Sequence, residues 1–183
     1  MNYQNYQNAR DQVWALLIQQ NIRELPVRVS GICRDLGMIV KTLDDAKSDG
    51  YSAVVDGRPV IVISTACTVQ RQRFTLAHEL GHVILGHVDR YRLINREPSP
   101  DDNPIEQAAN VFASRLLAPA CVLWGCNAKT PEQIAELCDI SLQAATYRAE
   151  RMKLLYERGR FLTSPLERQV YEQFSNYIKH HKL

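Results

Sequence analysis

The chain has 183 residues, enough for one compact domain or for one domain with a small appended subdomain. A chain of this size buries roughly 70% of the surface that it exposes when unfolded, so folding alone requires neither disulfides nor a structural metal. Its content of 45% hydrophobic and 23% charged residues is typical of a globular protein, and a formal net charge of +2 is too small to indicate a nucleic-acid partner by itself.

The amino-terminal residues lack the basic and apolar segments of a secretory signal, and no apolar run approaches the ~18 residues needed to cross a bilayer. The cysteines are odd in number and include no CxxC pair. These features favour a cytoplasmic protein without membrane contact, whose cysteines are small core residues rather than metal ligands. The cysteines are Cys33, Cys67, Cys121, Cys126 and Cys138.

The first half of the chain predicts two helices followed by a small β-structure. The helices are expected at residues 9–22 and 27–37, and the strands at residues 38–41, 51–55 and 58–64. Asp56-Gly57 separates the last two strands, and both residue types tolerate the left-handed conformation of a tight hairpin turn. These two strands are therefore predicted to form a β-hairpin.

The second half of the chain returns to helical spacing. Helices are expected at residues 69–86 and 105–119, and residues 88–104, which carry three prolines, are expected to form a loop. Residues 130–159 predict a short helix, a three-residue break and a longer helix, and residues 164–183 predict one last helix with a basic end.

Residues 73–87 read RFTLAHELGHVILGH and place several ionisable side chains in an apolar helical pattern. On a helix His78 and His82 lie on one face, about 6 Å apart along the axis, so both imidazoles can bind one Zn²⁺ ion. Glu79 is close enough to contact a water molecule on that ion. This H-E-x-x-H pattern predicts two zinc ligands and a general base.

A catalytic zinc ion normally has three protein ligands and one position for water. The metzincin pattern would require glycine and histidine where this chain has Leu85 and Val88, so that class is not expected. A carboxylate on a second helix is the alternative, and Glu106 is the one candidate within a rigid amphipathic helix. We therefore predict one zinc ion per chain, with Glu106 as third ligand; the loop offers Asp89, Glu97, Asp101 and Asp102 as alternatives.

Three further positions lie close to these residues in the sequence. Asn110 follows Glu106 by one helical turn and either anchors a ligand or the loop, or is a plain polar helix residue. His87 lies about 140° around the helix from His82, too far to bind the same ion, and is interpreted as an ordinary helix-end histidine rather than a support for a ligand. Possible donors to an oxyanion, which no spacing rule distinguishes, are Tyr91 and Arg73.

Residues 106–119 read EQAANVFASRLLAP. Together with the H-E-x-x-H helix and the preceding hairpin, this motif resembles the ImmA/IrrE family of bacterial zinc metallopeptidases, whose second helix has the pattern E-x-x-A-N-x-F-A-x-x-L-L-x-P. The resemblance covers roughly residues 24 to 160. It implies that His78, His82 and Glu106 are zinc ligands and that Glu79 is the catalytic base, the same four residues that the spacing indicates.

The resemblance also implies a fold and a substrate. We expect the α+β class, with a minimal zincin-like core of a small β-sheet and active-site helices over residues 1–125, followed by a helical C-terminal subdomain over residues 126–183. The target in the resembled family is typically a repressor with its own helix-turn-helix, encoded on a mobile element or in a stress-response locus. A cytoplasmic zinc endopeptidase that cleaves such a repressor and relieves repression is therefore the leading hypothesis.

The C-terminal subdomain has the outline of a helix-turn-helix. Thr130 can cap the first helix, Pro131 suits its first position, and the second helix is expected to begin after Ser141. In a DNA-binding protein Leu142, Gln143 and Thr146 would face base edges, but only Gln143 reads bases well.

The net charge of this region also bears on DNA binding. Residues 148–183 carry 8 Lys or Arg against 4 Glu, and Arg148 and Arg151 could contact phosphates weakly. We nevertheless expect the helix pair to brace the fold and not to bind a specific DNA sequence. The competing hypothesis is a non-catalytic regulator with a structural zinc ion, whose C-terminal helices bind DNA or a partner protein. Glu79 argues against it, because a structural site has no use for a carboxylate between two ligating histidines.

Overall fold

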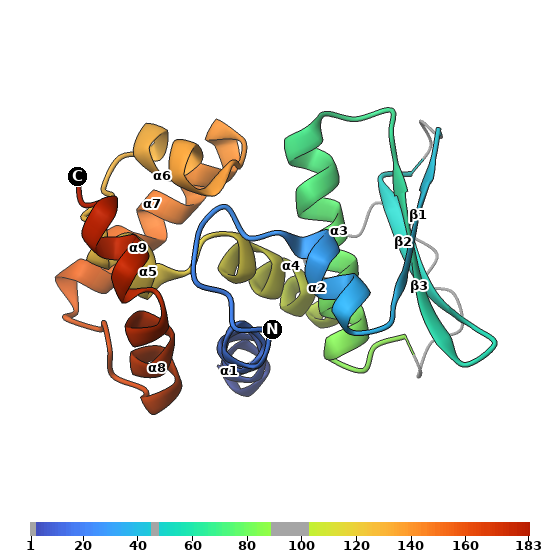
Figure 1. Cartoon of the computed structure of the whole chain (residues 1–183), viewed down its shortest axis with the longest axis horizontal. Helices are drawn as coiled ribbons and strands as arrows, with labels where there is room; N and C mark the ends of the chain where they lie inside the picture. The colour runs from blue at the N-terminus through green and yellow to red at the C-terminus, as the bar shows by residue number, and fades with distance from the viewer. Residues whose placement is uncertain (1–2, 45–47, 89–102) are drawn as a thin grey trace. The chain divides into compact units, whose positions relative to one another are not determined.

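The computed structural model describes residues 3–44, 48–88 and 103–183, and it confirms the mixed α+β class (Figure 1). The described chain forms two compact units, one of Met1–Gln12 with Arg28–Ala113 and the other of Val13–Val27 with Ser114–Leu183. The first contains the sheet, and the second is helical. The division expected near residue 125 stays a prediction.

The first unit is built on a three-stranded sheet in the order β1-β3-β2, formed by β1 (Ile39–Leu43), β2 (Gly50–Val55) and β3 (Arg58–Ser64). The predicted hairpin is confirmed, because β2 and β3 are antiparallel with Val55 opposite Arg58, and Asp56 and Gly57 both have positive φ. Strand β1 pairs in parallel with β3, a partnership that the strand pattern did not predict.

Two helices pack beside this sheet: α2 (Val29–Asp35) contacts β1, and α3 (Val69–Ile84) contacts β2 and β3. Figure 1 shows both helices on the same side of the strands. Ile61 and Ile63 of β3 are buried. The sheet therefore supports α3, the helix that carries the H-E-x-x-H residues.

Helix α3 confirms the expected helix and begins where Thr68 caps it by accepting a hydrogen bond from the Arg71 backbone N–H. Helix α4 (Pro104–Leu117) confirms the second expected helix. The two helices approach closely at Gly81, where a β-carbon would lie 3.0 Å from Phe112 Cδ1. The missing side chain of Gly81 thus allows α4 to pack against the helix that carries both motif histidines.

The second unit includes most of the C-terminal helices. The predicted helix pair is confirmed as α6 (Pro131–Cys138) and α7 (Leu142–Glu157), with a capping box between Thr130 and Gln133 and with Ser141 capping α7. The short helix α5 (Ala120–Gly125), which begins directly after Pro119, was not predicted.

The prediction of one final helix is wrong. The tail forms α8 (Pro165–Gln173) and α9 (Ser175–His180), separated by Phe174. The Phe174 side chain is fully buried and meets the Tyr177 ring edge-on, while Gln173 Nε2 donates to the Leu17 carbonyl at 2.8 Å. These tertiary contacts override the continuous helical pattern. Helix α1 (Tyr3–Gln19) also begins earlier than expected.

One expectation about apolar runs needs correction. Among the described residues, the segment Pro104–Gly125 is long and apolar enough to cross a membrane by length and composition. Buried residues make up 72% of its most apolar window, which is the property of a core helix. The segment includes α4 and α5, so its apolar character is explained by packing inside the protein.

Candidate metal centre

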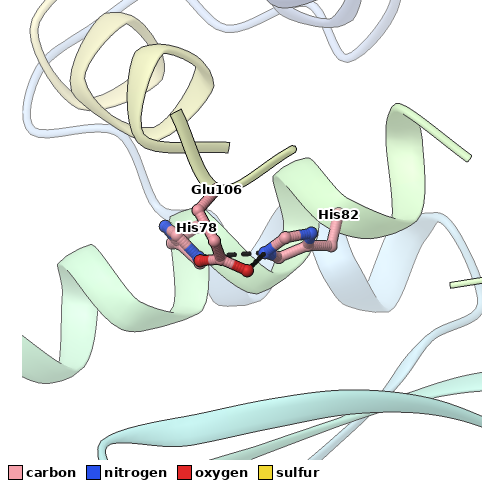
Figure 2. A group of neighbouring side chains, drawn as sticks. All are labelled: His78, His82 and Glu106. Carbon is pink, nitrogen blue, oxygen red and sulfur yellow. Dashed lines mark hydrogen bonds and ion pairs between the residues drawn. The ribbon is translucent and has the colours of Figure 1, made fainter. Parts of the chain in front are cut away.

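Helix α3 brings His78 and His82 together on one face. Both side chains are buried, and their Nε2 atoms lie 3.0 Å apart. Figure 2 shows the two imidazoles pointing into the same space above their helix. The four-residue spacing thus places the two side chains on one face of the helix, as helix geometry predicts.

The carboxylate of Glu106 reaches the same space from the first turn of α4 (Figure 2). Its Oε2 lies 3.1 Å from His78 Nε2, and its Oε1 lies 3.3 Å from His82 Nε2. The adjacent imidazoles, His78 first and then His82, hold the pKa of the Glu106 carboxyl well below its usual range. The group is therefore an anion at neutral pH.

These three residues fit a bound cation. Donors about 2.0–2.1 Å from a tetrahedral zinc ion lie roughly 3.3 Å from one another, and the three separations here are 3.0, 3.1 and 3.3 Å. In addition, Glu106 Oε1 is buried and receives no hydrogen bond from the part of the chain that the structure describes. A cation would satisfy this oxygen. Within the described residues, His78, His82 and Glu106 form a group that could hold a metal ion.

Asn110 explains how the His78 ring is oriented. Its Oδ1 lies 2.9 Å from His78 Nδ1, and because an amide oxygen can only accept, Nδ1 carries the proton of the neutral ring. His78 Nε2 then presents a lone pair to the space beside Glu106. Of the two interpretations of Asn110, the structure supports the one in which it anchors a ligand candidate.

The Glu79 side chain is buried, and its position is set by the sheet. Ser52 on β2 donates a hydrogen bond from Oγ to Glu79 Oε2 at 2.8 Å. Sequence reasoning did not identify Ser52, since nothing local distinguishes it from any other serine in a strand. The pairing of β2 with β3 and the packing of α3 beside them bring the two residues together.

The interpretation of His87 as an ordinary helix-end residue is wrong. Helix α3 ends at Ile84, so the angle calculated for a continuous helix does not apply to His87. The ring returns toward the helix, and its Nδ1 lies 3.1 Å from His82 Nδ1. As expected, His87 does not belong to the group of three candidate ligands.

Several other candidates lie outside the described residues. These are the possible ligands Asp89, Glu97, Asp101 and Asp102, and the possible oxyanion donor Tyr91. The other oxyanion candidate, Arg73, is half-buried on α3.

Residues 33–150 match the peptidase family described as the IrrE N-terminal-like domain, and this match covers more than half of the chain. The chain belongs to this family. The IrrE-like region includes the whole sheet, α3, α4 and α6, and it ends within α7.

Two curated relatives are similar over a shorter segment. The radiation response metalloprotease IrrE of Deinococcus radiodurans is 34% identical over 97 residues, which is 48% of this chain and 30% of the relative. The protein of the same name from Deinococcus deserti is 35% identical over 97 residues, 48% of this chain and 34% of the relative. The chain thus spans about a third of the length of these relatives. Family and relatives both imply a metal, and the group formed by His78, His82 and Glu106 is suited to bind one.

Proposed function

We propose that this protein is a zinc-dependent endopeptidase in which His78, His82 and Glu106 hold one zinc ion and Glu79 is the catalytic base. The observation that carries the proposal is the convergence of two imidazole nitrogens and a carboxylate within 3.0–3.3 Å, beside a buried carboxylate that is not part of this group. Two neutral imidazoles and one carboxylate are the ligand set of thermolysin-like catalytic zinc sites.

The reaction that suits this site is hydrolysis of a peptide bond. Zinc bound to these residues supplies Lewis acidity, which activates a water molecule and polarises the scissile carbonyl. Glu79 accepts the proton of the attacking water and transfers it to the leaving amine. Ser52 donates to Glu79 Oε2 and so fixes the orientation of the carboxylate for these proton transfers.

We further propose that the substrate is a protein, specifically a repressor with a helix-turn-helix, and that its cleavage relieves transcriptional repression. The support is the family membership together with the resemblance to the ImmA/IrrE motifs. The relatives are named radiation response metalloproteases, which is compatible with a role in a stress response.

A reducing, cytoplasmic compartment is part of the proposal. The five cysteines are all free thiols. Burial raises the pKa of Cys33 and of Cys121 to about 12, so these side chains remain protonated, inert core residues at neutral pH. Such thiols need no oxidising environment.

The C-terminal helix pair is assigned a structural role in this proposal. Arg148, which was expected to contact phosphates weakly, is buried and donates from Nε to the Ala118 carbonyl at 2.8 Å, so that expectation is wrong. Thr146 directs its hydroxyl to the Leu142 carbonyl of its own helix at 2.9 Å. Leu142 is exposed on α7 and has no group that can form a hydrogen bond with a base edge. These features favour bracing over DNA recognition.

The experiment that tests the function uses Glu79→Gln, which keeps the size of the side chain but removes its proton acceptor. The protein is co-expressed with a helix-turn-helix repressor encoded beside it, where its source genome has one, and the repressor is followed on a gel. Turnover should fall by roughly 10²–10⁴-fold, the usual contribution of a positioned general base, while zinc content stays unchanged. The matched control is Glu157→Gln on the exposed side of α7, which should cleave normally.

Two results would contradict parts of the proposal. Normal cleavage by Glu79→Gln would show that Glu79 is not the base. Failure of the wild-type protein to cleave, although it retains zinc, would show that the neighbouring repressor is not the substrate.

A further inference from the structure

His87 follows α3 but folds back onto its last turn. The His87 backbone N–H donates to the His82 carbonyl at 2.9 Å, and the Gly86 N–H donates to the Val83 carbonyl at 3.1 Å. These two bonds form a Schellman motif, in which Gly86 has a φ of +71°. A residue with a β-carbon adopts this conformation at a cost, so Gly86 is suited to reverse the chain here. The turn places the His87 side chain beside His82.

The contact involves the ring nitrogen of His82 that faces away from Glu106. His82 Nε2 lies near His78 and Glu106, whereas His82 Nδ1 lies 3.1 Å from His87 Nδ1. The two ring planes are inclined by 65° with centroids 5.2 Å apart, so the rings meet edge-on and are not stacked. Asn110 occupies the equivalent position on the other histidine, 2.9 Å from His78 Nδ1.

The protonation pattern follows from the chemistry of imidazole. Two ring nitrogens form a hydrogen bond only when one carries a proton and the other a lone pair. A histidine that binds a metal through Nε2 presents a lone pair there, so its neutral ring carries its proton on Nδ1. His82 Nδ1–H is then the donor, His87 Nδ1 is the acceptor, and the proton of neutral His87 lies on Nε2.

We propose that His87 is a positioning residue for the metal site: it accepts the Nδ1–H of His82 and thereby fixes the orientation and tautomer of that ligand. This inference rests on the metal site proposed above and deepens it. Both ligand histidines then have a dedicated acceptor on the outer nitrogen, Asn110 for His78 and His87 for His82. Acceptors of this kind hold the ring in place and increase the basicity of the ligating nitrogen, and their loss typically weakens metal binding 10–100-fold.

The test measures zinc affinity directly and therefore needs no substrate. The purified 183-residue chain and its variants are titrated with Zn²⁺ against a chromogenic chelator at neutral pH, and Co²⁺ substitution reports the geometry of the site by its visible absorption. The variants are His87→Ala, which removes the acceptor, and His87→Asn, whose amide oxygen can occupy the position of the imidazole Nδ1. His180→Ala on the exposed side of α9 is the matched control.

We expect the Kd for Zn²⁺ to rise roughly 10–100-fold in His87→Ala, to return to within a few-fold of wild type in His87→Asn, and to stay unchanged in His180→Ala. Wild-type affinity in His87→Ala would overturn the inference. Equal weakening in His87→Ala and His87→Asn would also overturn it, because the effect would then come from packing and not from the acceptor. Failure of the wild-type protein to bind Zn²⁺ would instead overturn the metal site itself, and the inference with it.

Discussion

The two compact units both bury ionisable side chains, His78, Glu79 and His82 in the sheet-containing unit and Arg148 and Glu167 in the helical unit. In the helical unit these groups form hydrogen bonds with the backbone. Arg148 Nε donates to the Ala118 carbonyl at the end of α4, and Glu167 Oε2 accepts from the Thr163 backbone N–H just before α8. Each contact gives a partner to a backbone polar group near a helix end.

In the sheet-containing unit the two buried histidines instead point at one another. The Nε2 atoms of the two rings and the Glu106 carboxylate converge on a common point. The Nδ1 atoms of the rings contact Asn110 and His87. Converging acceptors repel unless a cation lies between them. Burial of charge is therefore not by itself a sign of a functional site. The direction in which the lone pairs point distinguishes the proposed metal centre from structural ion contacts.

The largest expected effect concerns the ligand from α4. Glu106→Ala removes one of three donors, so zinc affinity should fall by more than the roughly 100-fold upper limit typical of residues that only support a ligand. Metal analysis of the purified protein together with chelator titration measures this loss. The matched control, Glu132→Ala in the first turn of α6, should bind zinc as the wild type does. Undiminished zinc binding by Glu106→Ala would reopen the alternative candidates Asp89, Glu97, Asp101 and Asp102.

A change in the helical unit should affect stability and leave the metal site intact. Arg148→Met removes the donor to the Ala118 carbonyl. Loss of a hydrogen bond from a charged group should lower the free energy of unfolding by about 1.5–3 kcal/mol.

Urea denaturation of the zinc-loaded protein measures this change, and zinc content is determined in parallel. Arg158→Met, at the exposed end of the same helix, is the control and should shift stability by less than about 0.5 kcal/mol. Release of zinc by Arg148→Met under native conditions would break the comparison, because the helical unit would then contribute to the metal centre.

The smallest expected effect concerns the orientation of the base. Ser52→Ala removes the hydroxyl that donates to Glu79 Oε2. A hydrogen bond to a carboxylate contributes about 1.5 kcal/mol, so kcat should fall roughly tenfold while KM and zinc content stay unchanged. Ser52→Thr retains the hydroxyl and suits a strand, so it should restore most of the rate.

Steady-state cleavage of the co-expressed repressor, once purified, provides the measurement, with Ser175→Ala on α9 as the control. A fall in both Ser52→Ala and Ser52→Thr would assign the effect to packing of β2 against α3 and not to the hydroxyl.

The sequence by itself determined the parts of this protein that depend on residues close together along the chain. The four-residue spacing of His78 and His82 places both rings on one face of a helix because the α-helix repeats every 3.6 residues. Asp56-Gly57 specified a hairpin turn, and Thr130 with Pro131 specified a helix start, because these residues have strong local conformational preferences. The motif of residues 106–119 also indicated the family, to which the match over residues 33–150 assigns the chain.

Only the tertiary structure decided which distant side chains support these motifs. Ser52 meets Glu79 because β2 pairs with β3 and α3 packs beside both strands, and these long-range contacts leave no local pattern in the sequence. His87 reaches His82 because the chain leaves the helix at Gly86, where a helical projection no longer describes its position. The break at Phe174 has a similar origin, since burial of a large side chain can override helix propensity. Local periodicity thus predicts the elements and the ligand pair, whereas packing between elements decides what holds the ligands and the base in place.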